Sequence, residues 1–208
     1  MARPREYDDD LRVRLVDAAG RLLAAEGPTA VSTRRVAAEV GTTTAAIYSL
    51  LGSKEELVRA MYREGFARLG ERLAAVPASD DPVTHLWALG RAYHDAALAS
   101  PHLYGVMFER PIPEFCPSDD DAALSLGTLQ VLIDGVGDCV RADIFAGDAE
   151  ALAMRFWALA HGVASLTIAG MLTPADAEAI LDGGTTALSV GLQADVAGWT
   201  APHHPERG

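Results

Sequence analysis

Side chains suited to contact with nucleic acid are concentrated between Ser32 and Lys54. Hydroxyl groups of threonine and tyrosine donate hydrogen bonds to phosphate oxygens, and small side chains reach the edges of bases in the DNA grooves. Lys54 is the only lysine in a chain that contains 16 arginines. It stands where a new helix is expected to begin, so its ammonium group and the helix N-terminus would meet the same phosphate.

Two short helices joined by a tight turn would place these side chains on one surface. Ser32 is suited to cap a helix over residues 33–40, and Thr43 is suited to cap a second helix of similar length. Gly41 tolerates the positive φ of the turn, and the small Ala37 allows the two helices to cross closely. The apolar contacts are expected from Val36, Val40, Ile47 and Leu50. The pattern therefore predicts a helix-turn-helix whose second helix enters a major groove.

The predicted DNA contacts come from both helices and from the start of the next one. The second helix carries hydroxyl and methyl groups but no long polar side chain, so it cannot read guanine through two hydrogen bonds. Either Arg34 or Arg35 on the first helix reads a base, or specificity comes from the shape of the DNA. The candidate DNA-contacting residues are Thr33, Arg34, Arg35, Thr43, Thr44, Ala45, Tyr48 and Lys54.

The remaining sequence has a helical pattern, in which apolar residues recur every three or four positions, and no convincing alternating strand. A first helix is expected to end near Gly27, and a fourth is expected to run from a Ser53 cap toward Val76. A loop is expected from Arg110 to Asp121. Helices are expected around it, over 83–99, 101–109, 122–144 and 149–171, with a last one after Thr173.

The sequence therefore predicts an all-α fold in two parts. An N-terminal three-helix domain with the helix-turn-helix occupies residues 1–53, and a connecting helix follows over about 54–76. A helical bundle for ligand binding and dimerisation occupies residues 77–197, and residues 198–208 form a flexible tail.

The charge is divided unequally between these parts. The chain carries 17 basic and 29 acidic side chains, a net charge of −12. Residues 1–63 hold ten basic and nine acidic side chains, a net charge of +1, and the other 145 residues hold seven and twenty, a net charge of −13. Since non-specific DNA binding is mostly electrostatic, the acidic part is expected to stay away from DNA.

Other classes of function lack support in the sequence. It has no phosphate-binding loop, HExxH sequence or nucleophile elbow, so we expect no enzyme, cofactor or metal site. The acidic runs at 8–10 and 119–121 are expected to be solvated. Cys116 and Cys139 do not form a disulfide framework, which favours a reducing cytoplasm. Residues 156–175 lack charged side chains but are rich in alanine and contain His161, so we expect a buried helix and no membrane span.

The N-terminal segment resembles the TetR family of bacterial repressors over about residues 9–62. The resemblance rests on the run from Val31 to Gly41, which holds the first helix of the helix-turn-helix, on Ala46-Ile-Tyr48, and on Gly52-Ser-Lys-Glu-Glu-Leu57. Ser49–Leu51 departs from the family, whose members commonly carry aromatic or histidine residues after the tyrosine. A phosphate contact is therefore in doubt there, and Tyr48 and Lys54 would carry more of the anchoring.

The C-terminal part resembles one TetR subfamily through Phe156-Trp157-Ala-Leu-Ala-His161-Gly162, a Trp-His-Gly pattern. The resemblance implies a helical domain that binds a small molecule and dimerises through its last two long helices. Gly184 and Gly191 would allow close approach in that interface, and the alternative is that they only loosen a buried helix. The ligand-binding candidates are aromatic residues and one histidine, namely Trp87, Tyr93, Tyr104, Phe108, Phe156, Trp157 and His161.

Together these features predict a homodimeric transcriptional repressor of the bacterial cytoplasm, associated with the nucleoid. Its partners would be a palindromic or near-palindromic DNA operator and a small apolar effector that releases it. The alternative hypothesis is a helical interaction module of the same fold that has lost sequence-specific DNA binding.

Overall fold

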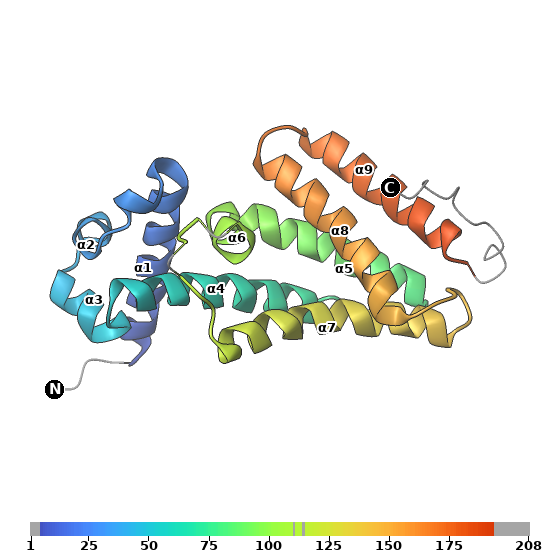
Figure 1. The fold of residues 1–208 in the computed structure, drawn as a ribbon, viewed down its shortest axis with the longest axis horizontal. Coiled ribbons are helices and arrows are strands. Elements are labelled where there is room, and N and C mark those ends of the chain that lie inside the picture. The colour runs from blue at the N-terminus through green and yellow to red at the C-terminus, as the bar shows by residue number, and fades with distance from the viewer. Residues whose placement is uncertain (1–4, 110, 114, 194–208) are drawn as a thin grey trace, which may run out of the picture. The chain divides into compact units, whose positions relative to one another are not determined.

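The computed structural model describes residues 5–109, 111–113 and 115–193, which form nine α-helices and one short 3₁₀ helix (Figure 1). The predicted all-α fold is confirmed, and the predicted tail at 198–208 lies outside the described residues. The helices are α1 Arg5–Glu26, α2 Thr33–Val40, α3 Thr44–Leu51, α4 Lys54–Ala74, α5 Pro82–Ala99, α6 Pro101–Phe108, α7 Asp119–Arg141, α8 Ala149–Ile168 and α9 Pro174–Gly191.

The described residues divide into two compact units. The first holds the described residues up to Arg72 together with those from Ala96 to Thr128, and the second holds those from Leu73 to Asp95 and from Leu129 onward. Helices α4, α5 and α7 each contribute residues to both units.

In the first unit, α1 packs against α2 and α3 to form a three-helix head. Val36 and Ile47 are fully buried, and Ala37 is 3% exposed, as the crossing of α2 and α3 requires. The sequence also assigned Leu50 to this core, but the structure leaves Leu50 half-buried and buries Leu51 instead.

Helix caps and a glycine turn, all encoded locally in the sequence, stabilise the head. The Ser32 and Thr43 hydroxyls accept hydrogen bonds from the backbone amides of Arg35 and Ala46, at 3.3 and 3.1 Å. Gly41 adopts φ 74° and ψ 37°, a left-handed conformation that costs glycine little. These residues fix the turn, and with it the direction in which α3 projects.

Helix α7 begins earlier than predicted, at Asp119, so the three aspartates lie in its first turn and not in a loop. Acidic side chains are favoured there because they complement the helix dipole. Asp121 is fully buried, contrary to the prediction that it is solvated. Arg59 and Arg63 of α4 donate to it from their Nε atoms, at 3.1 and 2.5 Å, and the Ser118 amide donates at 2.9 Å.

In the second unit, α8 and α9 pack side by side (Figure 1). The core around them is built from residues of α5, α7, α8, the connection between α7 and α8, and the segment that follows α9, namely Leu86, Val136, Cys139, Phe145, Leu152, Ala153, Phe156 and Leu192. Arg91 of α5 binds Asp182 of α9 at 2.5 Å and Glu178 at 3.3 Å, which further ties these helices together.

Helices α7 and α8 are each long and apolar enough to cross a membrane, judged by length and composition alone. Core helices of soluble proteins pass the same test, so length and composition do not distinguish the two cases. Within α8, 33% of the most apolar 18-residue stretch is buried inside the chain.

Candidate functional site

The exposed surface of the head collects most of the predicted DNA-contacting side chains. Thr43, Ala45 and Tyr48 of the α3 segment are exposed, and Tyr48 has 57% of its surface open. Arg34 at the start of α2 is exposed, and Thr33 and Thr44 are half-buried. The structure therefore brings residues of α2 and α3 onto the outer side of one three-helix head.

A direct contact links the two helices on this surface. The Thr33 hydroxyl at the start of α2 and the Tyr48 hydroxyl of α3 lie 3.4 Å apart, within hydrogen-bond distance, and either can donate. The contact holds the exposed Tyr48 ring beside the N-terminus of α2, where unpaired backbone amides attract anions. Thr33 and Tyr48, both predicted to contact DNA, therefore lie side by side on the surface of the head.

Arg35 is placed differently from its neighbour Arg34. Its two terminal nitrogens each donate to one carboxylate oxygen of Glu26 at the end of α1, both at 2.7 Å. The hydrogen bond with Arg35 lowers the pKa of Glu26, and the same bond raises the pKa of Arg35. Sequence reasoning treated Arg34 and Arg35 as equivalent readers, but in the structure Arg35 is engaged with Glu26.

Lys54 is exposed at the first position of α4. The Ser53 hydroxyl accepts from the Glu56 amide at 3.1 Å and so caps this helix, as the sequence predicted. The Glu56 side chain pairs with Arg59 in the next turn of the helix. Lys54 therefore stands at a helix N-terminus as a positive charge open to solvent.

One supporting residue of the head was missed at the level of sequence. Arg14 of α1 donates from Nη2 to the Val40 carbonyl at 2.9 Å and so satisfies an open carbonyl at the end of α2. Because the two residues are 26 positions apart, no local pattern indicates the bond. Arg14 fixes α2 against α1 just before the turn.

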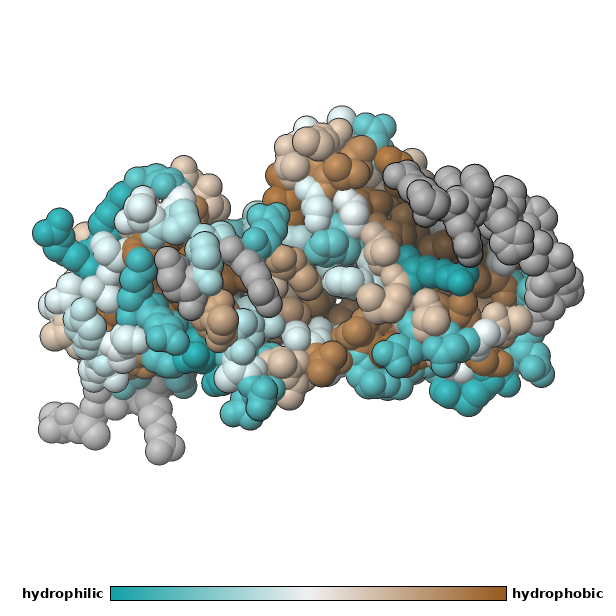
Figure 2. All heavy atoms as spheres, viewed as in Figure 1, coloured by the Kyte–Doolittle hydropathy of each residue, from teal (hydrophilic) through white to brown (hydrophobic). Residues whose placement is uncertain are grey.

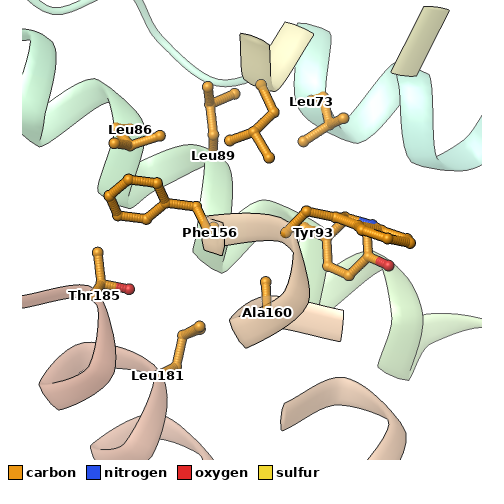
Figure 3. Close-up of a pocket in the computed structure, with 11 residues that line it drawn as sticks. Leu73, Leu86, Leu89, Tyr93, Phe156, Ala160, Leu181 and Thr185 are labelled. Atoms are coloured by element: carbon orange, nitrogen blue, oxygen red, sulfur yellow. The ribbon is translucent and has the colours of Figure 1, made fainter. Parts of the chain in front are cut away.

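A narrow, largely apolar cavity of about 30 Å³ lies in the second unit (Figure 3). Leucines of α4 and α5 lie on one side of it, and Leu181 and Thr185 of α9 lie on the other. The lining residues are Leu73, Leu86, Leu89, Gly90, Tyr93, Leu132, Phe156, Trp157, Ala160, Leu181 and Thr185. No charged side chain lines it, so the cavity suits an uncharged apolar group.

Three of the seven predicted ligand-binding residues, Tyr93, Phe156 and Trp157, line this cavity. His161 stands directly behind them, since its Nδ1 lies 3.1 Å from the Tyr93 hydroxyl and its ring lies 5.2 Å from that of Trp157. Trp87 does not line the cavity. The leucines that line the cavity were not predicted, because leucines at helical spacing are typical of an ordinary hydrophobic core.

The other two predicted ligand residues belong to the first unit and serve its core. The rings of Tyr104 and Phe108 on α6 lie 4.8 Å apart, and Phe108 packs edge-on against Phe66 of α4 at 5.6 Å. Within the described residues, no group of three histidine, cysteine or acidic side chains is placed to hold a metal ion.

Comparison with known proteins places this arrangement among regulators. Residues 15–61 match the family model described as bacterial regulatory proteins of the tetR family, and residues 86–188 match a tetracyclin repressor-like C-terminal domain. The HTH-type transcriptional regulator Rv1816 of Mycobacterium tuberculosis is 24% identical over 149 residues, which make up 69% of this chain. The match spans 62% of the length of that relative.

Solved structures share the fold over most of the chain. A protein of unknown function from Rhodococcus sp. RHA1 is 26% identical, with a TM-score of 0.74, covering 88% of this chain and 95% of the other. The TetR family transcriptional regulator PfmR from Thermus thermophilus is 19% identical, also with a TM-score of 0.74, covering 86% and 99%. Both parts of the molecule thus match the family that the N-terminal residues resemble, a family of regulators and not of enzymes, and the chain belongs to the TetR family of bacterial regulatory proteins.

Proposed function

We propose that this chain is a DNA-binding transcriptional repressor that acts as a homodimer in the bacterial cytoplasm, on the nucleoid. The observation that carries the proposal is the head itself, a closed helix-turn-helix whose outer surface presents Tyr48, Arg34 and Lys54. Each of these side chains is suited to contact phosphate, and α3 between them is free to enter a major groove. Residues 1–53 would form the DNA-binding domain.

The dimer would form through α8 and α9. Large apolar side chains on these two helices and the turn between them are open to solvent, at Met154, Leu166, Met171, Ile180 and Val190. Brown, hydrophobic atoms lie among paler ones on the face that Figure 2 shows of the second unit. Met171, in the turn between α8 and α9, is 73% exposed. Two such helices from each subunit can bury these side chains in a four-helix interface. A symmetric dimer would bind a palindromic operator with half-sites about 34–36 Å apart.

The apolar cavity lined by Tyr93, Phe156 and Trp157 would receive the effector. Its volume of about 30 Å³ is far below the roughly 300 Å³ or more of occupied ligand pockets. An effector must therefore push apart the helices that line the cavity, and one of these is α4, through Leu73. Displacement of α4, the connecting helix, would alter the spacing of the two heads and lower the affinity for DNA.

The experiment that tests the proposal is fluorescence anisotropy of the full chain on DNA from its own upstream region, titrated at several salt concentrations beside a scrambled duplex. Tight, sequence-dependent binding with a steep salt dependence is expected. Lys54→Ala should weaken binding to all sequences alike, since a phosphate contact carries no sequence information. If neither that duplex nor any member of a random duplex library is bound specifically, the chain is instead an interaction module that retains the fold without reading DNA.

A further inference from the structure

The surface that α3 offers to DNA consists of small side chains. From Gly41 to Ser53, a stretch that the structure describes throughout, there is no arginine, lysine, asparagine, glutamine or acidic residue. Ala45 is exposed on this helix, and Thr44 and Ala46 are half-buried beside it. Guanine is read by arginine or lysine and adenine by asparagine or glutamine, so α3 cannot form either of these paired hydrogen-bond contacts.

Helix α2 supplies few of the long polar side chains that α3 does not have. Arg35, which has the length and charge to reach guanine, directs both terminal nitrogens to Glu26 at 2.7 Å. Arg34 remains exposed, but it lies at the first turn of α2, next to Thr33 and the helix N-terminus, a position suited to phosphate. The chemistry left to α3 is therefore that of methyl and single hydroxyl groups.

One base carries an apolar group that such a surface can recognise. Thymine presents its 5-methyl group in the major groove, where alanine and the threonine methyl make apolar contact with it. We propose that the head selects its DNA site through thymine methyl groups, contacted by Ala45 and Thr44. This proposal rests on the DNA-binding function proposed above and adds the class of base that the site must contain.

The test begins with selection of duplexes from a random library by the full chain, which yields the preferred site. Each thymine in one half-site is then replaced by uracil, which removes the methyl group and keeps every hydrogen-bonding atom. Anisotropy should show about a fourfold loss of affinity at each contacted thymine, the value expected for one methyl group withdrawn from an apolar contact. We expect this loss at one or two positions per half-site and unchanged affinity elsewhere.

Variants assign the effect to α3. Ala45→Gly should bind the thymine and uracil duplexes equally at the position that Ala45 contacts, because the methyl group that senses the difference is gone, and should keep the preference at any thymine that Thr44 contacts. Ala46→Gly is the matched control, since it has the same helix-propensity cost on the same helix but alters a half-buried position, and it should keep the fourfold preference. The uracil measurement itself uses the unaltered protein and so does not depend on how well either variant folds.

The possible failures are distinguishable. If sequence-specific duplexes are selected but no thymine-to-uracil change alters affinity by more than about 1.5-fold, the methyl-reading proposal is wrong and the DNA-binding function stands. The same holds if affinity falls only when 7-deazaguanine replaces guanine, since that result assigns the reading to Arg34. If the library yields no specific duplex, the proposed function itself fails.

Discussion

Glu26 at the end of α1 and Arg35 in α2 form an ion pair with two parallel hydrogen bonds, each 2.7 Å long. The paired geometry matches the planar guanidinium to the planar carboxylate, which makes it stronger than a single contact. The pair lies on the surface, with both side chains nearly half exposed, so its contribution to stability is small. Its main consequence is that a cation on the head is neutralised within the chain.

Removing that carboxylate should strengthen DNA binding. In Glu26→Gln, Arg35 is released and can contact a phosphate, so affinity at low salt should rise and the slope of log affinity against log salt should steepen by about 0.9. Glu39→Gln removes the same charge from α2, where the carboxylate acts on Arg35 through its charge and not through the paired hydrogen bonds, so its slope should change less. Anisotropy titrations between 50 and 200 mM salt measure both slopes, and equal slopes in the two variants would refute a specific role for the pair.

The buried Asp121 should be a principal source of stability in the first unit. Burial alone would raise the pKa of this carboxyl, but hydrogen bonds from Ser118, Arg63 and Arg59 outweigh that effect and lower the pKa to about 2. Asp121→Asn leaves the two arginines without their counter-charge, so the free energy of unfolding should fall by about 3 kcal/mol. Asp120→Asn alters the same helix turn at an exposed site and should change it by less than about 0.5 kcal/mol.

The pH dependence of stability gives a second measure of Asp121. Its pKa in the folded chain lies below the ordinary value of 3.8, so the carboxylate stabilises the fold fully above pH 4. This stabilisation should be lost as the pH falls from about 4 toward 2, and urea titrations across that range should show the loss in the wild type. A similar decline in Asp121→Asn would mean that other carboxyl groups cause it.

The helix-turn-helix could be predicted from the sequence because its determinants are local. The Ser32 and Thr43 caps and the Gly41 turn each act within a few residues, and the structure places all three as expected. The choice between Leu50 and Leu51 as the core residue could not be made in this way. It depends on the angle at which α3 meets its neighbours, which a periodic pattern does not determine.

Contacts between distant segments account for what the sequence did not predict. Asp121 reads as one of three solvated aspartates until Arg59 and Arg63, 62 and 58 positions away, are brought against it. The sequence alone indicates that Arg35 is an unpaired arginine that could contact a base, because only the fold brings Glu26 beside it. The cavity is likewise assembled from several helices, so the aromatic residues that line it could not be separated from Tyr104 and Phe108, which pack in the core of the first unit.

Gly65 of α4 should accommodate a side chain only if Met107 of α6, which packs directly on its backbone, moves. A Cβ atom at Gly65 would lie 2.5 Å from the Met107 sulfur and 2.8 Å from its Cγ, inside van der Waals contact. Gly65→Ala should therefore lower the free energy of unfolding by about 1–2 kcal/mol, despite the better helix propensity of alanine. Gly127→Ala on α7 meets no atom within 4 Å and should raise it by up to about 1 kcal/mol. Denaturant titration measures the free energy of unfolding of both variants, and equal changes in the two would exclude overpacking at Gly65.

Filling the cavity should abolish binding of apolar ligands there. A Cβ atom at Gly90 meets no atom within 4 Å, so a side chain can start there, and the rest of a leucine would occupy the small cavity. Millimolar indole, a neutral aromatic probe, should raise the Tm of the wild type and leave that of Gly90→Leu unchanged. Gly127→Leu adds the same side chain outside the cavity and should respond as the wild type does; a Tm rise in Gly90→Leu would show that indole binds elsewhere.

The exposed apolar side chains of α9 should be required for dimerisation, and through it for DNA binding. Ile180 is 44% exposed, and Ile180→Asp would place a charge in the proposed four-helix interface, where no counter-charge compensates its desolvation. Sedimentation velocity should show a monomer, and DNA affinity should fall by about a hundredfold or more because the second half-site is no longer bound by a linked head. Leu126 of α7 is more exposed, at 62%, so Leu126→Asp introduces the same charge outside that interface and should leave the dimer intact. If instead Leu126→Asp gives the monomer and Ile180→Asp does not, the interface lies on α7, and exposure on α8 and α9 has another cause.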